Sequence, residues 1–87
     1  MAIYQIEWKK SAIRELKHLD RKIIQRIIYA VDSLPKNPFP TGARKLTGSE
    51  KTYRIRVGDY RVVYEVHTKT ITIEIIRVRH RKDVYRK

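Results

Sequence analysis

The sequence has 87 residues, a net charge of +12 and no cysteine. This length allows one domain with a small core, and without cysteine the chain has neither a disulfide framework nor a thiolate metal site. No apolar run approaches the length of a membrane span, and the first residues lack the basic start and long apolar stretch of a signal peptide. We therefore expect a single cytoplasmic domain over residues 1–87 that does not bind membranes.

The positive charge is unevenly distributed along the chain. Residues 1–40 contain 8 Lys/Arg and 4 Asp/Glu, whereas residues 41–87 contain 13 and 5. A small protein with such an excess of cations most often binds a polyanion. Ribosomal proteins, nucleases and toxins directed at DNA gyrase share this property, so charge alone does not distinguish them.

The first half of the chain predicts a strand and two helices. Residues 3–8 have a short, partly alternating strand pattern, and residues 9–18 carry apolar residues at helical spacing. Asp20 is a favourable N-cap for a second helix, whose apolar stripe ends at Pro35 and should pack on a sheet. After a turn-rich connection, residues 44–46 either form a short strand or lead into the next element.

A β-hairpin with different chemistry on its two faces is predicted next. In residues 53–57, apolar residues alternate with arginines, as in a half-buried strand. Gly58 and Asp59 suit a two-residue type II′ turn, which needs glycine at its first position. This turn places Arg56 opposite Arg61. Like charges directly across a strand pair are destabilising, which an anionic ligand would explain, although a solvated surface could carry the pair at small cost.

A second tight turn, at Thr68 and Lys69, is expected to place Val66 opposite Ile71 in a third long strand. One sheet face is then apolar, and the two helices must cover it. The other face is open and is formed by Arg54, Arg56, Arg61, Val63, Glu65, His67, Thr72, Glu74 and Ile76. The predicted fold is α+β with the order β-α-α-β-β-β, a twisted antiparallel sheet with two helices on one face and cations on the other.

The chain contains the segments YRIRV at 53–57, YRVVY at 60–64 and HRKDVY at 80–85. Together they resemble RelE-type toxins of the RelE/ParE superfamily, and the likeness covers nearly the whole chain. The tail favours the RelE branch over the ParE branch. The resemblance implies the toxin of a type II toxin–antitoxin system, an mRNA interferase that cuts the codon in the ribosomal A site. It also implies a RelB-like antitoxin that wraps and neutralises the toxin.

The residues fit metal-free RNA cleavage, in which the 2′-hydroxyl attacks the adjacent phosphate. This reaction needs a base, an acid for the leaving 5′ oxygen, and cations around the phosphorane. Arginine forks bind two phosphate oxygens at once. RNA is therefore expected to contact Arg54, Arg56, Arg61, Arg77, Arg79 and Lys82.

The resemblance assigns individual roles within this set. Arg61 matches the arginine that stabilises the transition state, Arg81 matches the general acid, and Tyr85 matches the aromatic residue that orients a base. Many relatives carry lysine at the positions of Arg54 and Arg56, and arginine cannot act as a base. His80 is then the candidate proton carrier, because histidine titrates near neutral pH, and the alternative is a surface histidine that is merely solvated. The residues predicted to carry the reaction are Arg56, Arg61, His80, Arg81 and Tyr85.

No cofactor or metal is expected, because no Gly-rich phosphate loop is present and the three histidines are scattered without a carboxylate cluster. His18 and His67 are interpreted as structural or solvated. Two alternative functions remain open. One is a ParE-like inhibitor of DNA gyrase without nuclease activity, and the other is a ribosome- or RNA-binding factor whose basic surface performs no chemistry.

Overall fold

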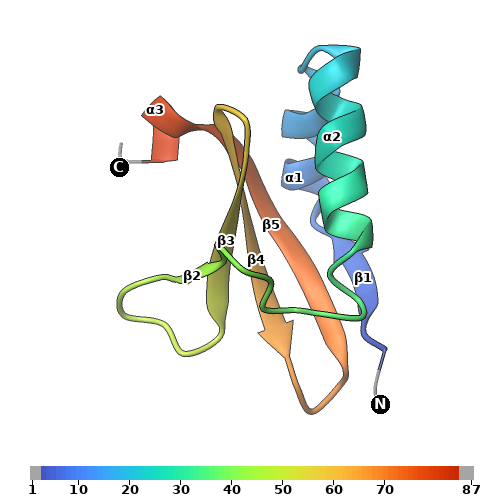
Figure 1. Cartoon of the computed structure of the whole chain (residues 1–87), viewed down its shortest axis with the longest axis vertical. Coiled ribbons are helices and arrows are strands. Elements are labelled where there is room, and N and C mark those ends of the chain that lie inside the picture. The colour runs from blue at the N-terminus through green and yellow to red at the C-terminus, as the bar shows by residue number, and fades with distance from the viewer. Residues whose placement is uncertain (1–2, 85–87) are drawn as a thin grey trace.

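The computed structural model describes residues 3–84 and consists of a five-stranded sheet with two helices on one face (Figure 1). The elements in chain order are β1 (Gln5–Trp8), α1 (Lys10–Lys17), α2 (Arg21–Asp32), β2 (Arg44–Lys45), β3 (Thr52–Val57), β4 (Tyr60–His67), β5 (Thr72–His80) and α3 (Arg81–Val84). The α+β class and the predicted order of elements are confirmed. The short β2 precedes the hairpin, and the one-turn α3 follows the last long strand.

The sheet is mixed, with the strand order β1-β5-β4-β3-β2. β1 lies parallel to β5, with Gln5 opposite Thr72, whereas the other neighbours are antiparallel. The prediction of a wholly antiparallel sheet was therefore wrong for β1. The two helices form the connection that returns the chain across the sheet, and alternation within a short segment carries no information about so distant a partner.

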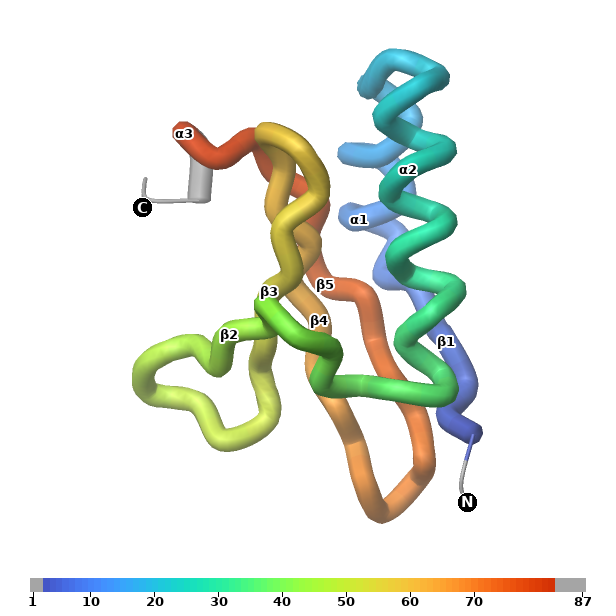
Figure 2. The backbone as a smooth tube through the Cα atoms, in the orientation of Figure 1, coloured from blue at the N-terminus to red at the C-terminus, as the bar shows by residue number. Residues whose placement is uncertain are grey.

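The core lies between the sheet and the two helices, which occupy the same side of it (Figure 2). α1 buries Ala12 and Leu16, and α2 buries Ile27 and Val31 at one-turn spacing. Asp20 occupies the predicted N-cap of α2 with an extended backbone, but its side chain makes no capping hydrogen bond. Apolar burial against the sheet, more than capping, therefore positions these helices.

The β3–β4 hairpin has the predicted register. Val57 pairs with Tyr60, and Arg56 pairs with Arg61. Gly58 has a φ of 59°, and Asp59 is not among the described residues with positive φ. This combination is that of a type II′ turn, because only its first central residue needs a positive φ.

The β4–β5 connection differs from the prediction. Residues 68–71 form a four-residue turn, and Val66 pairs with Ile73 instead of Ile71. Ile71 adopts a φ of 53°, an uncommon conformation for a β-branched residue. Its carbonyl oxygen accepts the Gln5 N–H at 2.9 Å, which joins the turn to the start of β1. A two-residue turn would have put Ile71 in the strand and lost this link.

A β-bulge in β5 changes which residues face the helices. Tyr64 pairs with Ile75, but its neighbour Val63 pairs with Arg77, so Ile76 is an extra residue in β5. Beyond the bulge the alternation reverses, and Val78 is buried at 3% exposure. Strict alternation would have turned Arg77 and Arg79 toward the helices, whereas the bulge brings both to the open face.

Tyr64 fixes the connection between the helices and the hairpin. Its side chain is fully buried, and its hydroxyl donates a hydrogen bond of 2.7 Å to the Pro38 carbonyl oxygen. Burial, with a smaller contribution from Tyr53, raises the pKa of Tyr64 from 10.0 to about 12. The neutral phenol thus holds the residue 35–42 segment against the sheet and supports the edge near Gly42.

Candidate nucleic-acid interface

Two cross-strand rows of arginines lie on the open face of the sheet. In the first row, Arg56 pairs with Arg61, and Arg61 pairs with Arg79. In the second row, Arg44 pairs with Arg54, Arg54 with Val63, and Val63 with Arg77. We call these six arginines the arginine rows. Directly paired side chains lie about 5 Å apart at Cβ, so the rows concentrate positive charge over a small area.

Val63 shows how closely the arginines cover this face. It is only 8% exposed, although α1 and α2 lie on the other side of the sheet. Its two cross-strand neighbours are Arg54 and Arg77. Arginine stems can cover apolar surface while their guanidinium groups stay in water. The apolar centre of the open face is thus shielded by the cations that surround it.

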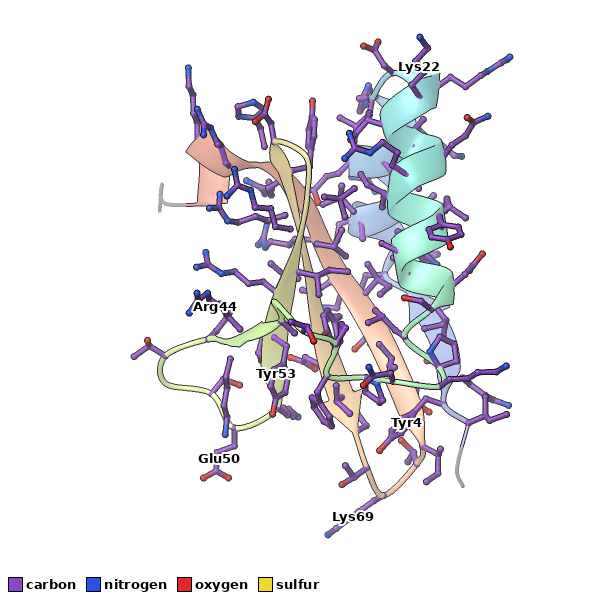
Figure 3. All side chains as sticks on the ribbon, viewed as in Figure 1. Tyr4, Lys22, Arg44, Glu50, Tyr53 and Lys69 are labelled. Carbon is purple, nitrogen blue, oxygen red and sulfur yellow. The ribbon has the colours of Figure 1, made fainter. Side chains whose placement is uncertain are left out.

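A hollow of about 280 Å³ opens between the rows at the β3 edge. It is lined by Gly42, Arg44, Arg54, Ile55, Arg56 and Arg61. Arg44 projects from the side of the sheet away from the helices, above the loop that joins β2 to β3 (Figure 3). Four arginines line this one hollow, and each guanidinium group offers donors in the planar fork that suits phosphate oxygens.

One arginine of the rows is neutralised from the helix side. Glu15 of α1 accepts hydrogen bonds from Arg79 Nε and, at 2.9 Å, from the Val78 N–H. The upper part of β5 extends beyond β1, so this carboxylate satisfies an amide at a free sheet edge. Arg79 is therefore held in place by a carboxylate, and it contributes less free positive charge than Arg56 or Arg77.

The tail beyond β5 is tied to the hairpin. The Arg81 N–H donates a hydrogen bond of 2.7 Å to the Asp59 carbonyl oxygen, which anchors α3 at the β3–β4 turn. The side chains of Arg81 and Lys82 are exposed. The structure therefore brings Arg81 to the same end of the sheet as Arg61. Tyr85, also predicted as a site residue, lies outside the described residues.

His80 lies apart from the arginine rows. It pairs with Tyr60 across the sheet, and the two rings meet edge to face at a centroid distance of 5.3 Å. Alternation places it on the face of Val78, opposite to that of Arg79. Its Nδ1 accepts the Lys82 N–H at 3.3 Å. His80 thus supports the first turn of α3.

The far end of the open face carries acidic side chains beside a histidine. His67 Nε2 lies 3.2 Å from a Glu65 oxygen and 3.9 Å from a Glu74 oxygen. The prediction that the histidines lack a carboxylate cluster was therefore wrong for His67. Glu65 and Glu74 are cross-strand partners in the row next to Arg54 and Arg77. The face thus runs from cationic at the β3–β4 turn to mixed at the β4–β5 turn.

Sequence reasoning missed two residues of this interface. Arg44 belongs to the interface because β2 pairs with β3. The sequence did not decide whether residues 44–46 form a strand. Glu15 was hidden because its partners, Val78 and Arg79, lie 63 and 64 residues away in the chain. The signal available in the sequence was that Glu15 is an acidic residue in an otherwise basic helix, next to its apolar positions.

Residues 6–85 match the family described as ParE toxin of type II toxin–antitoxin system, parDE. The chain belongs to the RelE/ParE toxin superfamily. Its relatives identify the branch. Toxin RelG of Mycobacterium tuberculosis is 32% identical over an alignment of 88 positions, which covers 97% of this chain and 98% of RelG. The predicted resemblance to RelE-type toxins is therefore confirmed.

Solved structures agree with this assignment. The toxin fold in the archaeal RelE-RelB complex from Pyrococcus horikoshii superposes with a TM-score of 0.82 at 31% identity, covering 91% of this chain and 96% of that one. The RelB-RelE complex from Methanococcus jannaschii gives a TM-score of 0.76 at 31% identity, covering 92% of this chain and 95% of that one.

In residues 3–84 of this RelE-type toxin, no helix is long and apolar enough to cross a membrane.

Proposed function

We propose that this RelE-type toxin is an endoribonuclease that cuts mRNA in the ribosomal A site without a metal. The observation that supports this most is the register of Arg56, Arg61 and Arg79, which are in one row on an uncovered sheet face. Repulsion within such a row is relieved by an anion with several oxygens. An RNA phosphate at the hollow of about 280 Å³ supplies that anion.

The proposed chemistry is attack of the 2′-hydroxyl on the adjacent phosphate. The products are a 2′,3′-cyclic phosphate and a new 5′-hydroxyl end. Arg61 stands at the centre of its row and stabilises the charge that develops on the phosphorane. Arg81, which is anchored beside the same turn, is the general acid that protonates the 5′ oxygen as it leaves. Tyr85 orients a neighbouring base by stacking, as the family resemblance implies.

The described residues supply ligands for phosphate more readily than a base that accepts the 2′-hydroxyl proton. Arginine does not act as a base in proteins, and His80 Nδ1 accepts the Lys82 N–H. We therefore propose that cleavage depends on the ribosome, which aligns the 2′-hydroxyl with the phosphate and supplies the group or the water molecule that accepts the 2′ proton. Alignment of this kind can supply a large part of the barrier reduction.

We also propose a RelB-like antitoxin as the physiological partner. The solved complexes of P. horikoshii and M. jannaschii each pair RelE with RelB. A net charge of +12 favours an acidic partner and a salt-sensitive association. To block RNA, such a partner must cover part of the arginine rows or displace the tail that carries Arg81 and Tyr85.

The alternative is a ParE-like inhibitor of DNA gyrase, which the description of the matching family favours. Two measurements on the same induced culture separate the alternatives. Primer extension on abundant messages should show new 5′ ends inside coding regions within minutes, while plasmid supercoiling stays unchanged. Relaxed or linearised plasmid with intact messages would instead support gyrase inhibition. Arrested translation with neither change would support a non-catalytic ribosome-binding factor.

A further inference from the structure

A second hollow, of about 390 Å³, lies on the other side of the β3 edge, between α2 and the β3–β4 turn. Its lining includes Lys22, Arg26 and Tyr29 of α2, together with Arg56 and Gly58 of the hairpin. We call it the α2 groove. Arg56 also lines the hollow between the arginine rows, so the two hollows meet at this side chain.

The three α2 residues form a single stripe along the groove. They stand at positions i, i+4 and i+7, which lie on one face of a helix and span about 10 Å. Figure 3 shows Lys22 at the end of α2 that lies beside the β3–β4 turn. Tyr29 is 81% exposed, the highest value among the exposed large hydrophobic residues of the described chain. Its ring therefore has an open face and contributes little to the core.

Two guanidinium groups approach the β3–β4 turn from the two sides of the sheet edge. Arg56 Nε donates a hydrogen bond of 3.2 Å to the Gly58 carbonyl oxygen. An Arg26 terminal nitrogen lies 3.2 Å from the position that a Cβ on Gly58 would occupy. Glycine at this turn therefore also makes room for Arg26. The acidic residue nearest to Gly58 in sequence is Asp59, which is exposed and forms no ion pair with the described cations.

We propose that the α2 groove binds a second segment of single-stranded RNA, with phosphates at Lys22, Arg26 and Arg56 and a base stacked on Tyr29. Exposed aromatics beside cations are the usual means of holding unpaired bases, because every base has a π face. Besides Tyr29, the apolar side chains of its lining are the small Ala30 and the buried Val57, whereas three of its residues are cations, so charge distinguishes this groove more than apolar surface does. This inference rests on the proposed function in one respect, because the RNA in the α2 groove is the same molecule that the arginine rows hold.

The first measurement is fluorescence anisotropy with the full-length toxin and a labelled 12-nucleotide RNA carrying 2′-O-methyl groups, which cannot be cleaved. We expect Tyr29→Ala to weaken binding by about 5-fold to 100-fold, the range of one base–aromatic stack, and Tyr29→Phe to bind within about twofold of the parent. Arg26→Gln should weaken binding and reduce the slope of log affinity against log salt by about 0.7. Arg14→Gln, an equal loss of charge on the exposed side of α1, is the matched control and should change the affinity least.

Parent-like affinity of the Tyr29→Ala variant would overturn the proposal, as would equal losses for Arg26→Gln and Arg14→Gln. The same variants are titrated with the purified cognate antitoxin. If Tyr29→Ala weakens antitoxin binding and leaves RNA binding unchanged, the groove is a protein site and the RNA proposal fails.

Cleavage of ribosome-bound message separates this inference from the proposed function. If the parent cuts no message but RNA binding still depends on Tyr29, the nuclease proposal fails and the groove stands. If the parent cuts message and the Tyr29→Ala variant binds and cuts like the parent, the groove alone fails.

Discussion

The two faces of one sheet have different roles in this toxin, and adjacent residues of β4 illustrate them. Val62 points to the helices and is fully buried among apolar side chains. Val63 points the other way and lies between Arg54 and Arg77 on the open face. The covered face supplies the free energy of folding, and the open face concentrates cations that folding alone does not need. Substitutions on the two faces should therefore separate stability from activity.

The sharpest test of this separation is Arg61→Ala. Arg61 is the central arginine of its row and lies away from the helices, so in the proposed reaction its loss removes the group that stabilises the phosphorane and leaves the core intact. Cleavage of ribosome-bound message should fall by about 100-fold or more, the scale for one transition-state donor. The melting temperature should stay within a few degrees. A variant that is as toxic as the parent would show that the arginine rows are not the site.

The opposite result is expected on the covered face. Ile75 is fully buried in the core, and Ile75→Ala leaves a cavity there. The free energy of unfolding should fall by about 2–5 kcal/mol in urea denaturation, while any protein that remains folded retains its cleavage rate. A loss below about 0.5 kcal/mol would contradict the assignment of this face as the core.

Glu15→Ala probes a contact between a helix on the covered face and an arginine of the open face. The substitution leaves the Val78 N–H without its acceptor at the sheet edge and releases Arg79. We expect a loss of about 1–3 kcal/mol in the free energy of unfolding. Activity per folded molecule should be kept, because Arg79 regains its full charge. An unchanged stability together with lost cleavage would mean that Glu15 acts in the reaction.

Tyr64→Phe should remove about 1 kcal/mol by deleting the hydrogen bond to Pro38. It also tests a pH dependence. Because the pKa of Tyr64 is raised from 10.0 to about 12, the folded protein holds this proton where the unfolded chain releases it. The contribution of this group to stability is therefore constant below pH 10 and is lost between pH 10 and about 12. The Phe variant should lose that part of the slope in a pH series of urea denaturations.

His80 gives the smallest expected effect and the finest distinction. If its role is to accept the Lys82 amide, His80→Asn should keep most activity, because asparagine also accepts a hydrogen bond at a helix start. His80→Ala should lose a few-fold. If His80 is instead the proton carrier, both variants should lose about 100-fold or more in single-turnover cleavage, together with a limb of the pH–rate profile near neutrality.

The sequence predicted the local features well. The β3–β4 register, the type II′ turn and the helix faces follow from alternation, glycine position and apolar spacing, which all act within a few residues. These features already place Arg54, Arg56 and Arg61 together. The superfamily was likewise recognisable from three short segments.

The remainder depended on contacts that are distant in sequence. The run Ile73 to Ile76 is mostly apolar, so alternation could not locate the bulge that turns Arg77 and Arg79 to the open face. The four-residue turn is joined to β1 by the Ile71 carbonyl oxygen, and β1 itself pairs with a strand at the other end of the chain. Arg44 and Glu15 enter the interface through the same kind of long-range pairing.

The measurement that tests the central claim most directly compares ribosome-bound and naked message. Purified toxin is mixed with equal concentrations of each, and products are followed by primer extension and by analysis of their ends. We predict rapid cutting of the ribosome-bound message, ends that carry a 2′,3′-cyclic phosphate, poor cutting of naked RNA, and almost no products with Arg61→Ala. Efficient cutting of naked RNA, or cutting that does not depend on Arg61, would contradict the account.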